Sequence, residues 1–415
     1  MIRPLILSSQ DIVGGAARAT YRLHQALRSI GVDSKMLVQT KYSQDNHVIG
    51  AQSRTSRRLT NLTFRLDQYP LRGYPDKRPG FFSPQWVPER TAVKATHLAP
   101  DIINLHWVNN GFLRIESIKA LPAPMVWTLH DMWPFTGGCH YSGDCNRYTQ
   151  PCGYCTLLNS QTEKDLSHKV WQRKSKSWHD VQLTIVALSR WLADCARQSA
   201  LFANRPIKVI PNCIDTDIWH PVATKSARAQ LNLPQDKKII GFGALKPTGE
   251  HRKGFHHLVD ALAHLAASDP EKQIELAILG EADSKQFQDL PLKTHLLGKL
   301  DDDHKMALFY ASLDTFVLPS LEDNLPNTIM EAMACAVPCV AFNIGGILDM
   351  VDHKINGFLC APFDSQELAE GVKWILEDWQ RQQMLSEKAR QKVLQTFAPK
   401  LVANQYLDLY LELME

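Results

Sequence analysis

Short apolar runs rich in β-branched residues alternate with longer amphipathic stretches along the first half of the chain. The runs predict strands over residues 4–8, 34–38, 102–106, 125–129 and 184–188. A helix is expected over residues 16–31, because apolar residues from Ala19 to Ile30 recur at helical spacing and Gly31 stops the pattern. This alternation is typical of βαβ units and a parallel sheet.

The second half repeats the alternation. It predicts strands over residues 239–243, 274–279, 295–297, 315–318 and 338–342, and helices over 255–267, 303–311, 327–335 and 366–378. We therefore expect an α/β protein with a domain over residues 1–205, a second over 206–400, and a last helix over 401–415 that returns to the first domain. Residues 53–92 and 133–160 break the alternation and are interpreted as insertions in the first domain.

Composition excludes several classes of protein. The 415 residues are 44% hydrophobic and 21% charged, which is ordinary for a globular enzyme and unlike a disordered or fibrous chain. The net charge of +3 gives no reason to expect a nucleic-acid partner. No run approaches the roughly 20 apolar residues that span a bilayer, and the first residues lack the apolar core of a signal peptide. We expect a cytoplasmic location, with peripheral contact at the inner membrane face as an alternative.

The most informative segment follows the strand predicted over residues 315–318. A turn leads into a helix that begins near Pro326 and Asn327. The N-terminus of such a helix suits a diphosphate, because its first N–H groups and its dipole favour anions. Glu331 lies one turn further on, where a carboxylate could accept both hydroxyls of a ribose. Asp323 precedes it by eight residues and could bind sugar hydroxyls.

This segment resembles the Glu-x7-Glu signature of retaining family 4 glycosyltransferases with the GT-B fold. The sequence departs from that signature at the first acid, where the spacing gives Asp323 and places Glu322 one residue too early. The resemblance implies two Rossmann-like domains facing a central cleft, a donor site that includes Leu325, Pro326, Asn327, Thr328 and Glu331, and catalytic roles for Asp323 and Glu331. The alternative is two ordinary acids around a helix start.

Other segments resemble the same family in the same order. Gly14 and Gly15 match the glycine loop that borders donor phosphate and acceptor, and residues 126–131 match its Thr-x-His-Asp strand end. The resemblance implies a catalytic role for His130 and an acceptor site that includes Gly14, Gly15, His130 and Asp131. His106 ends another strand at the same edge and is a further acceptor-side candidate, whereas a purely structural His130–Asp131 pair is the alternative.

The resemblance also assigns the groups that neutralise the donor diphosphate. Lys253 matches the family's lysine, while Ala244 stands where the family has arginine. Arg252 or Lys246 is the candidate replacement for that charge, with a solvated charge at a helix start as the alternative for Arg252.

Cysteines cluster in the second insertion. Cys139, Cys145, Cys152 and Cys155 fall within seventeen residues, and the last two have good chelate spacing. In a reducing compartment this pattern favours a structural zinc site, in which His140 could replace one thiol. Unliganded thiols in a loop or a redox-labile pair are the alternatives. No cofactor is expected for catalysis.

Residues 53–90 hold eight Lys or Arg against Asp67, Asp76 and Glu89. Because no clean amphipathic helix is visible, we interpret the segment as a solvated loop that anchors its aromatic residues on the domain. The alternative is contact with anionic lipid headgroups or a lipid-linked acceptor.

Together the motifs predict a glycosyltransferase. It would move a hexosyl group from a nucleoside diphosphate sugar to a growing oligosaccharide or a lipid-linked saccharide, with retention of configuration. The overall look is most similar to the subgroup involved in colanic-acid-like exopolysaccharide biosynthesis. Two alternatives stay open: a non-catalytic nucleotide-sugar-binding subunit of a polysaccharide assembly system, and a dinucleotide-dependent oxidoreductase. The second is disfavoured because neither predicted domain has Gly-x-Gly-x-x-Gly after its first strand.

Overall fold

The computed structural model describes residues 2–244, 249–281, 284–300 and 302–415. These residues form two compact units, one of residues 1–213 with 400–415 and the other of residues 214–399. The first unit extends beyond the expected boundary at residue 205, because residues 207–209 add a strand to its sheet.

The first unit is built on a parallel sheet with the order β3-β2-β1-β4-β5-β6-β7 among the described residues. Its strands are β1 (Pro4–Gln10), β2 (Lys35–Thr40), β3 (Val48–Ala51), β4 (Ile102–Leu105), β5 (Met125–Leu129), β6 (Leu183–Ala187) and β7 (Ile207–Val209). Its helices are α1 (Gly15–Ser29), α2 (Arg54–Asp67), α3 (Thr91–Leu98), α4 (Leu166–Trp178), α5 (Arg190–Gln198) and α12 (Pro399–Glu412). The order reverses between β1 and β4, which is where open α/β sheets bind ligands.

The second unit repeats this plan with the sheet order β10-β9-β8-β11-β12-β13. Its strands are β8 (Lys238–Gly243), β9 (Ile274–Leu279), β10 (Thr294–Leu296), β11 (Thr315–Leu318), β12 (Cys339–Phe342) and β13 (Gly357–Cys360). Its helices are α6 (Thr224–Gln230), α7 (Phe255–Ser268), α8 (Asp303–Ala311), α9 (Asn327–Ala334), α10 (Ser365–Leu376) and α11 (Trp379–Thr396). Here the order reverses between β8 and β11. Two doubly wound Rossmann-like units confirm the predicted fold class.

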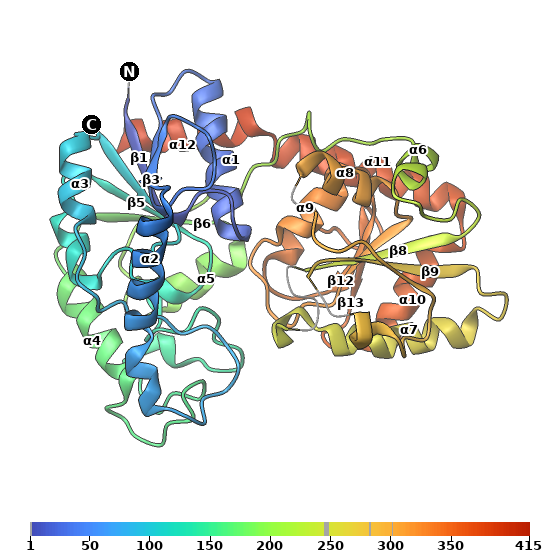
Figure 1. Cartoon of the computed structure of the whole chain (residues 1–415), viewed down its shortest axis with the longest axis horizontal. Helices are drawn as coiled ribbons and strands as arrows, with labels where there is room; N and C mark the ends of the chain where they lie inside the picture. Colours follow the sequence, from blue (N-terminus) through green and yellow to red (C-terminus); the bar gives the residue numbers. More distant parts are fainter. Residues whose placement is uncertain (1, 245–248, 282–283, 301) are drawn as a thin grey trace. The chain divides into compact units, whose positions relative to one another are not determined.

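The last helix, α12, packs on the first unit although the chain reaches it through the second (Figure 1). Val402, Tyr406 and Leu409 are buried in the cluster that also contains residues of β1, β5 and β6. The Asn104 amide donates to the Tyr410 hydroxyl over 2.8 Å, and the Thr128 and Tyr406 hydroxyls lie 3.1 Å apart. These buried hydrogen bonds fix the rotation of α12 against β4 and β5.

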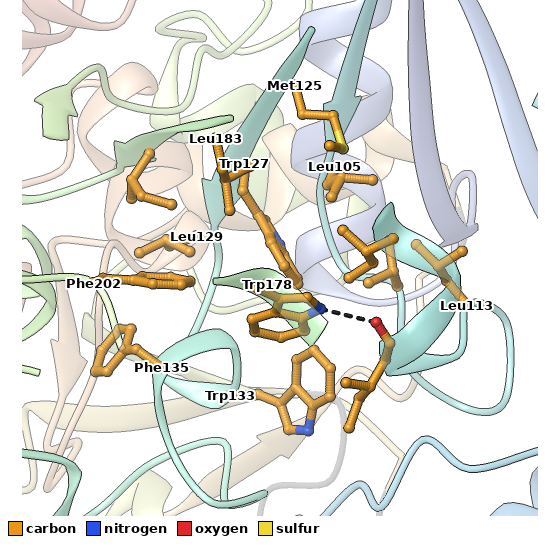
Figure 2. Close-up of a cluster of buried hydrophobic side chains, with 14 of the residues drawn as sticks. Leu105, Leu113, Met125, Trp127, Leu129, Trp133, Phe135, Trp178, Leu183 and Phe202 are labelled. Carbon is orange, nitrogen blue, oxygen red and sulfur yellow. Dashed lines mark hydrogen bonds between the residues drawn. The ribbon is translucent and has the colours of Figure 1, made fainter. Parts of the chain in front are cut away.

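Aromatic side chains fill the core of the first unit on the other face of the sheet. Figure 2 shows Trp127 of β5, Trp178 of α4 and Phe202 packed together with Trp133. The rings of Trp127 and Trp178 meet edge to face at 5.2 Å, and the Trp178 indole donates to the carbonyl of Ile115 over 2.8 Å. Each buried indole thus keeps a partner for its N–H while its ring supplies apolar contact area. This core supports the strand end that carries His130.

The first insertion differs from its interpretation as a loop. Residues 54–67 form the α-helix α2, followed by a short 3-10 helix at Tyr69–Gly73. Its three leucines, Leu59, Leu62 and Leu66, share one helical face and are 64%, 52% and 43% exposed. The spacing of Leu59, Leu62 and Leu66 with mostly polar residues between them is a signal of an amphipathic helix that the prediction did not use.

Candidate functional site

Two polar clusters lie at the carboxyl ends of strands, one in each unit. In the second unit, the loop after β8 and the loop after β11 come together at the point where the strand order reverses. The backbone N–H of Leu321 donates to the Arg252 carbonyl over 2.8 Å, and the Arg252 guanidinium donates to the Glu322 carbonyl over 2.6 Å. Sequence-distant residues 252–254 and 319–323 are therefore held against each other.

Two glycines make this close approach feasible. Gly254 has φ +69°, and a Cβ there would lie 1.7 Å from the Pro319 carbonyl oxygen. Gly345 has φ +54°, and a Cβ there would lie 2.2 Å from the Asp323 carbonyl oxygen. Both positions need a residue that adopts positive φ without a side chain. The Lys253-Gly254 pair thus combines a cation with the backbone contact that places it.

Asp323 is the centre of the cluster. One carboxylate oxygen lies 2.6 Å from Lys253 Nζ and accepts from the Ser320 hydroxyl over 3.1 Å, while the other lies 3.4 Å from the Arg252 guanidinium. Burial alone would raise the pKa of Asp323, but Lys253 and Arg252 outweigh it and hold that pKa below its usual value. Asp323 is therefore an anion that is buried between two cations. The structure brings together the three residues that the motifs assigned to sugar and diphosphate.

Glu331 lies deeper, in the second turn of α9. The carboxylate is buried, and one of its oxygens accepts a hydrogen bond from the Tyr310 hydroxyl of α8 over 3.1 Å. Burial, and then the adjacent Glu331, raise the pKa of that tyrosine well above its usual value. Tyr310 is a residue that the sequence search missed, because it lies twenty-one positions from Glu331 on another helix.

The residues between the two acids form the start of α9. Pro326 precedes the helix with extended backbone, and Asn327 is its first residue, as predicted. Leu325 and Pro326 are buried, whereas Asn327 and Thr328 are partly exposed. Four of the residues assigned to the donor therefore lie around one helix N-terminus, next to Asp323. Ala244 lies at the end of β8, and Lys246 falls outside the described residues.

In the first unit, two histidines meet at the switch point between β1 and β4. His106 follows β4 and His130 follows β5, and His106 Nδ1 lies 2.9 Å from His130 Nε2. The Thr20 hydroxyl of α1, which donates to the Ala16 carbonyl, lies 3.3 Å from the same nitrogen of His130. Burial lowers the pKa of His130 to about 4, against a smaller opposing effect of Asp131. Burial, and then His130, lower the pKa of His106 well below its usual value. Both rings are neutral at pH 7.

Asp131 faces a different set of partners. One of its oxygens lies 2.6 Å from His140 Nδ1 and accepts from the Trp107 indole over 2.9 Å. His140 Nε2 in turn lies 2.8 Å from the Ser83 hydroxyl. Burial would raise the pKa of Asp131, but His140 lowers it below its usual value. Both ring nitrogens of His140 have hydrogen-bond partners, so His140 would have to give up one of them to replace a thiol as a metal ligand.

Gly14 and Gly15 form the loop that leads into α1. Gly14 has φ +93° and immediately precedes the helix, which begins at Gly15. A Cβ at Gly14 would meet no atom within 4 Å, so the glycine serves the backbone conformation and leaves open space beside the helix N-terminus. The carboxylate of Asp11 accepts from the backbone N–H groups of Tyr42 and Ser43 over 2.9 and 2.8 Å, which anchors the start of this loop.

The clustered cysteines lie around one small cavity of the first unit. The cavity measures about 20 Å³, and Cys139, Cys145, Cys152 and Cys155 all line it. No disulfide joins any of the nine cysteines, all of which are described. Burial raises the pKa of Cys152 to about 12, and it raises the pKa of Cys139 further. Such thiols are poor nucleophiles, which disfavours the redox-labile pair.

Among the described residues, no helix is long and apolar enough to cross a membrane. The two doubly wound units, each with a parallel sheet, and a cluster of charged side chains at one switch point are typical of proteins that bind nucleotides or their sugar conjugates at the carboxyl edge of a sheet.

Family comparisons agree with this class. The model described as "Glycosyltransferase Family 4" matches residues 13–218, and the model described as "Glycosyl transferases group 1" matches residues 224–392. The chain therefore combines a family 4 region with a group 1 region and belongs among the glycosyltransferases of the GT-B fold. The two matches follow the two units of the structure.

Individual relatives are distant and varied. The chain is 26% identical to the N-acetyl-alpha-D-glucosaminyl L-malate synthase of Bacillus anthracis over 218 residues, which are 51% of this chain and 55% of the relative. It is 30% identical to the 2-deoxystreptamine glucosyltransferase of Streptomyces kanamyceticus over 187 residues, or 42% and 46% of the two chains. These matches thus span about half the length of the curated relatives.

Solved structures match over the whole chain. Sucrose-phosphate synthase from Thermosynechococcus elongatus superposes with a TM-score of 0.71 at 19% identity, covering 100% of this chain and 99% of the other. Anabaena HepE in complex with UDP and glucose gives 0.67 at 19% identity and covers 100% of both chains. At 19% identity, the similarity to these two structures establishes the fold of this chain and nothing more.

Proposed function

We propose that this protein is a retaining glycosyltransferase that moves a hexosyl group from a nucleoside diphosphate sugar to a saccharide acceptor. The observation that carries the proposal is the cluster of Asp323, Lys253 and Arg252 beside the N-terminus of α9, with Glu331 one turn below. Arg252 pairs with Glu250 and Lys253 with Asp323, so a diphosphate would share these cations with the two carboxylates and would gain the N–H groups of the helix N-terminus. A nearby carboxylate supplies the acceptor oxygens that ribose hydroxyls need.

Each donor group then has a defined task. Lys253 and the first N–H groups of α9 bind the diphosphate and stabilise the negative charge that grows on it when the glycosidic bond breaks. Glu331 holds the ribose, and the Tyr310 hydroxyl keeps that carboxylate oriented. Asp323 and the backbone of residues 325–327 bind the sugar. No nucleophile of the protein is required, since the acceptor attacks on the face that the diphosphate leaves.

The first unit provides the acceptor side in this proposal. His106 and His130 are neutral, so they can exchange hydrogen bonds with hydroxyl groups without binding an anion. The Asp131–His140 pair fixes the strand end that carries His130. The proposed acceptor is a growing oligosaccharide or a lipid-linked saccharide, and the proposed pathway is exopolysaccharide assembly. Both proposals rest on the resemblance of the sequence motifs to family 4 glycosyltransferases.

Thermal unfolding with UDP, GDP and ADP and their hexose conjugates tests the donor site. A ligand that binds only the folded protein stabilises it by about 2.7 kcal/mol at a hundredfold excess over its dissociation constant. We expect one base to raise Tm clearly. Proton NMR of the product formed from that donor should then show the same anomeric configuration as the donor. Binding without turnover, across a panel of saccharide acceptors, would support the non-catalytic subunit instead, and an inverted product would contradict retention.

We also infer a peripheral membrane contact through α2. Leu59, Leu62 and Leu66 form an exposed apolar face, and Arg58 and Arg65 lie beside it on the same helix. Helices with this arrangement lie in the interface of anionic membranes, with the leucines among the acyl chains and the arginines at the headgroups. The contact would bring the protein to a lipid-linked acceptor.

Vesicle sedimentation tests this contact. The protein should bind vesicles that contain phosphatidylglycerol more strongly than pure phosphatidylcholine, and Arg58→Glu with Arg65→Glu should abolish the difference. Leu62→Ser should weaken vesicle binding, whereas Leu394→Ser, which changes an exposed leucine of α11, should leave it unchanged. An absence of binding to either vesicle would end the proposal.

A further inference from the structure

The cavity lined by cysteines differs from an ordinary packing defect. Cys139 lies on the turn after Trp133–Phe135, Cys145 lies further along the loop, and Cys152 and Cys155 approach from its return toward α4. The volume of about 20 Å³ is room for one water-sized particle, and no more. Four cysteines from separate parts of a loop thus line one small space.

Backbone N–H groups are directed at two of the four sulfur atoms. The N–H of Gly137 is directed at the Cys152 sulfur, and the N–H groups of Leu157 and Leu158 at the Cys155 sulfur. The Asp165 carboxylate, which caps α4, also accepts from the backbone N–H of Cys155 over 2.8 Å. Backbone donors aimed at sulfur orient and tune metal-bound thiolates.

Two glycines allow segments of the loop to pack in close contact. A Cβ at Gly137 would lie 2.6 Å from the Cys152 Cβ, and a Cβ at Gly153 would lie 2.3 Å from the Glu163 carbonyl oxygen. The His168 ring, on the first turns of α4, lies 2.7 Å from the Cys152 carbonyl oxygen. The positions of the cysteines are therefore fixed by close contacts on either side.

A buried lysine completes the environment. Lys174 of α4 is fully buried, bonds the carbonyls of Trp133 and Thr136, and lies 3.6 Å above the Trp133 ring. Lys174 therefore holds Trp133 and Thr136, which lie on the turn that leads to Cys139, against α4.

We propose that Cys139, Cys145, Cys152 and Cys155 bind one zinc ion as a structural four-thiolate site. Tetrahedral coordination by four cysteines is the usual form of structural zinc, and binding releases the thiol protons to solvent. Within the part of the chain that the structure describes, no three His, Cys, Asp or Glu side chains already surround a common metal position. Coordination therefore requires the cysteine side chains to rotate into the cavity.

The site would tie the loop of residues 133–160 to the switch point of the first unit. The backbone N–H of Met132 donates to the His140 carbonyl over 2.9 Å, and His140 contacts Asp131 beside His130. A closed zinc site one residue before His140 would hold that contact in place. It has no catalytic role, since four protein ligands leave no open position for substrate.

Metal analysis of the full-length protein, purified from zinc-supplemented cells, tests the proposal. We expect one zinc ion per chain, and background zinc in Cys152→Ser with Cys155→Ser. The control is Cys195→Ser, which changes a buried cysteine of α5 in the same unit and should keep the metal.

A second measurement covers the case in which the double variant does not fold. A strong chelator should lower Tm of the wild-type protein, and added zinc should restore it. Cobalt substitution should give thiolate-to-cobalt charge transfer in the near-ultraviolet. Protein without metal, whose Tm responds to neither chelator nor zinc, would overturn the proposal. So would iron in place of zinc, or equal metal loss in Cys195→Ser.

Discussion

The two units share one sheet topology and differ in the charge at their switch points. In the second unit, the cluster at the end of β8 and β11 is ionic, with Asp323 buried between Lys253 and Arg252. In the first unit, the equivalent place between β1 and β4 holds His106 and His130, which burial keeps neutral. The same backbone plan therefore presents one surface suited to an anion and one suited to uncharged hydroxyls.

The difference comes from the loops. A positive-φ glycine, Gly254, allows the loop after β8 to pack on the Pro319 carbonyl and to deliver Lys253 to Asp323. In the first unit, the helix start at Gly14 stays open, and Thr20 of α1 reaches His130. The comparison indicates that the strand order selects where a ligand binds, whereas two or three loop residues select its charge.

The largest effect is expected from Glu331→Gln. Charged hydrogen bonds contribute about 1.5–3 kcal/mol each, so losing the charge should weaken the nucleoside diphosphate at least tenfold in calorimetry. Glu322→Gln is the matched control, because Glu322 is the neighbouring acid at the wrong spacing and should change affinity by less than about twofold. Equal losses in the two variants would show that general negative charge, and not the position of Glu331, matters.

A smaller and mixed effect is expected from Asp323→Asn. Removing the anion takes away the carboxylate that pairs with Lys253, while Arg252 keeps its ion pair with Glu250. This should lower the free energy of unfolding by about 2 kcal/mol, less than for a fully buried pair because Lys253 is partly exposed. Turnover should fall, while affinity for the nucleoside diphosphate stays within about threefold, since Lys253 is released. Asp323→Glu should recover most of the stability. Urea unfolding and calorimetry on the three proteins decide this.

The smallest effect is expected at the two neutral histidines of the first unit, His106 and His130, and concerns the pH dependence of stability. The folded pKa of His130 is lowered to about 4, and an unfolded histidine titrates near ~6.5. The unfolded chain therefore takes up a proton that the folded protein excludes, so this contribution to stability is complete above pH 6.5 and is lost as the pH falls toward 4. At pH 5.5 the loss is about 1.3 kcal/mol.

His130→Gln should remove that part of the pH dependence. Urea unfolding at pH 7.5 and 5.5 measures it, with His220→Gln as the control for a histidine that is exposed on the surface. If the free energy of unfolding fell by the same amount in wild type and in His130→Gln between the two pH values, His130 would not be the group that takes up a proton only on unfolding.

Sequence periodicity predicted most of the central strands, because buried parallel strands are continuous apolar runs. The bounds of β5, β9 and β11 agree with the prediction to the residue. The edge strands β3, β7 and β13 were missed, since they are short and in part exposed. Helices α4 and α11 were missed because they contain many Lys, Arg and Gln and few apolar residues. The sequence pattern alone therefore does not show which face of each helix is buried.

The donor residues could be predicted because one short segment carries most of them. Asn327 and Glu331 are one helical turn apart, and Asp323 lies in the turn before. Contacts between distant segments could not be predicted in this way. The pairing of Asp323 with Lys253 depends on how two loops meet, and the contacts of Asp131 with His140 and Ser83 depend on the fold of two insertions. Spacing along the chain contains no information about either.

The central claim is that the ionic cluster of the second unit, and not the neutral cluster of the first, binds the donor diphosphate. Calorimetric titration of wild type, Lys253→Met and His130→Gln with the nucleoside diphosphate that gives the largest thermal shift tests it directly. The account predicts at least tenfold weaker binding for Lys253→Met and less than about twofold change for His130→Gln. Unchanged affinity in Lys253→Met, with weaker binding in His130→Gln, would contradict it.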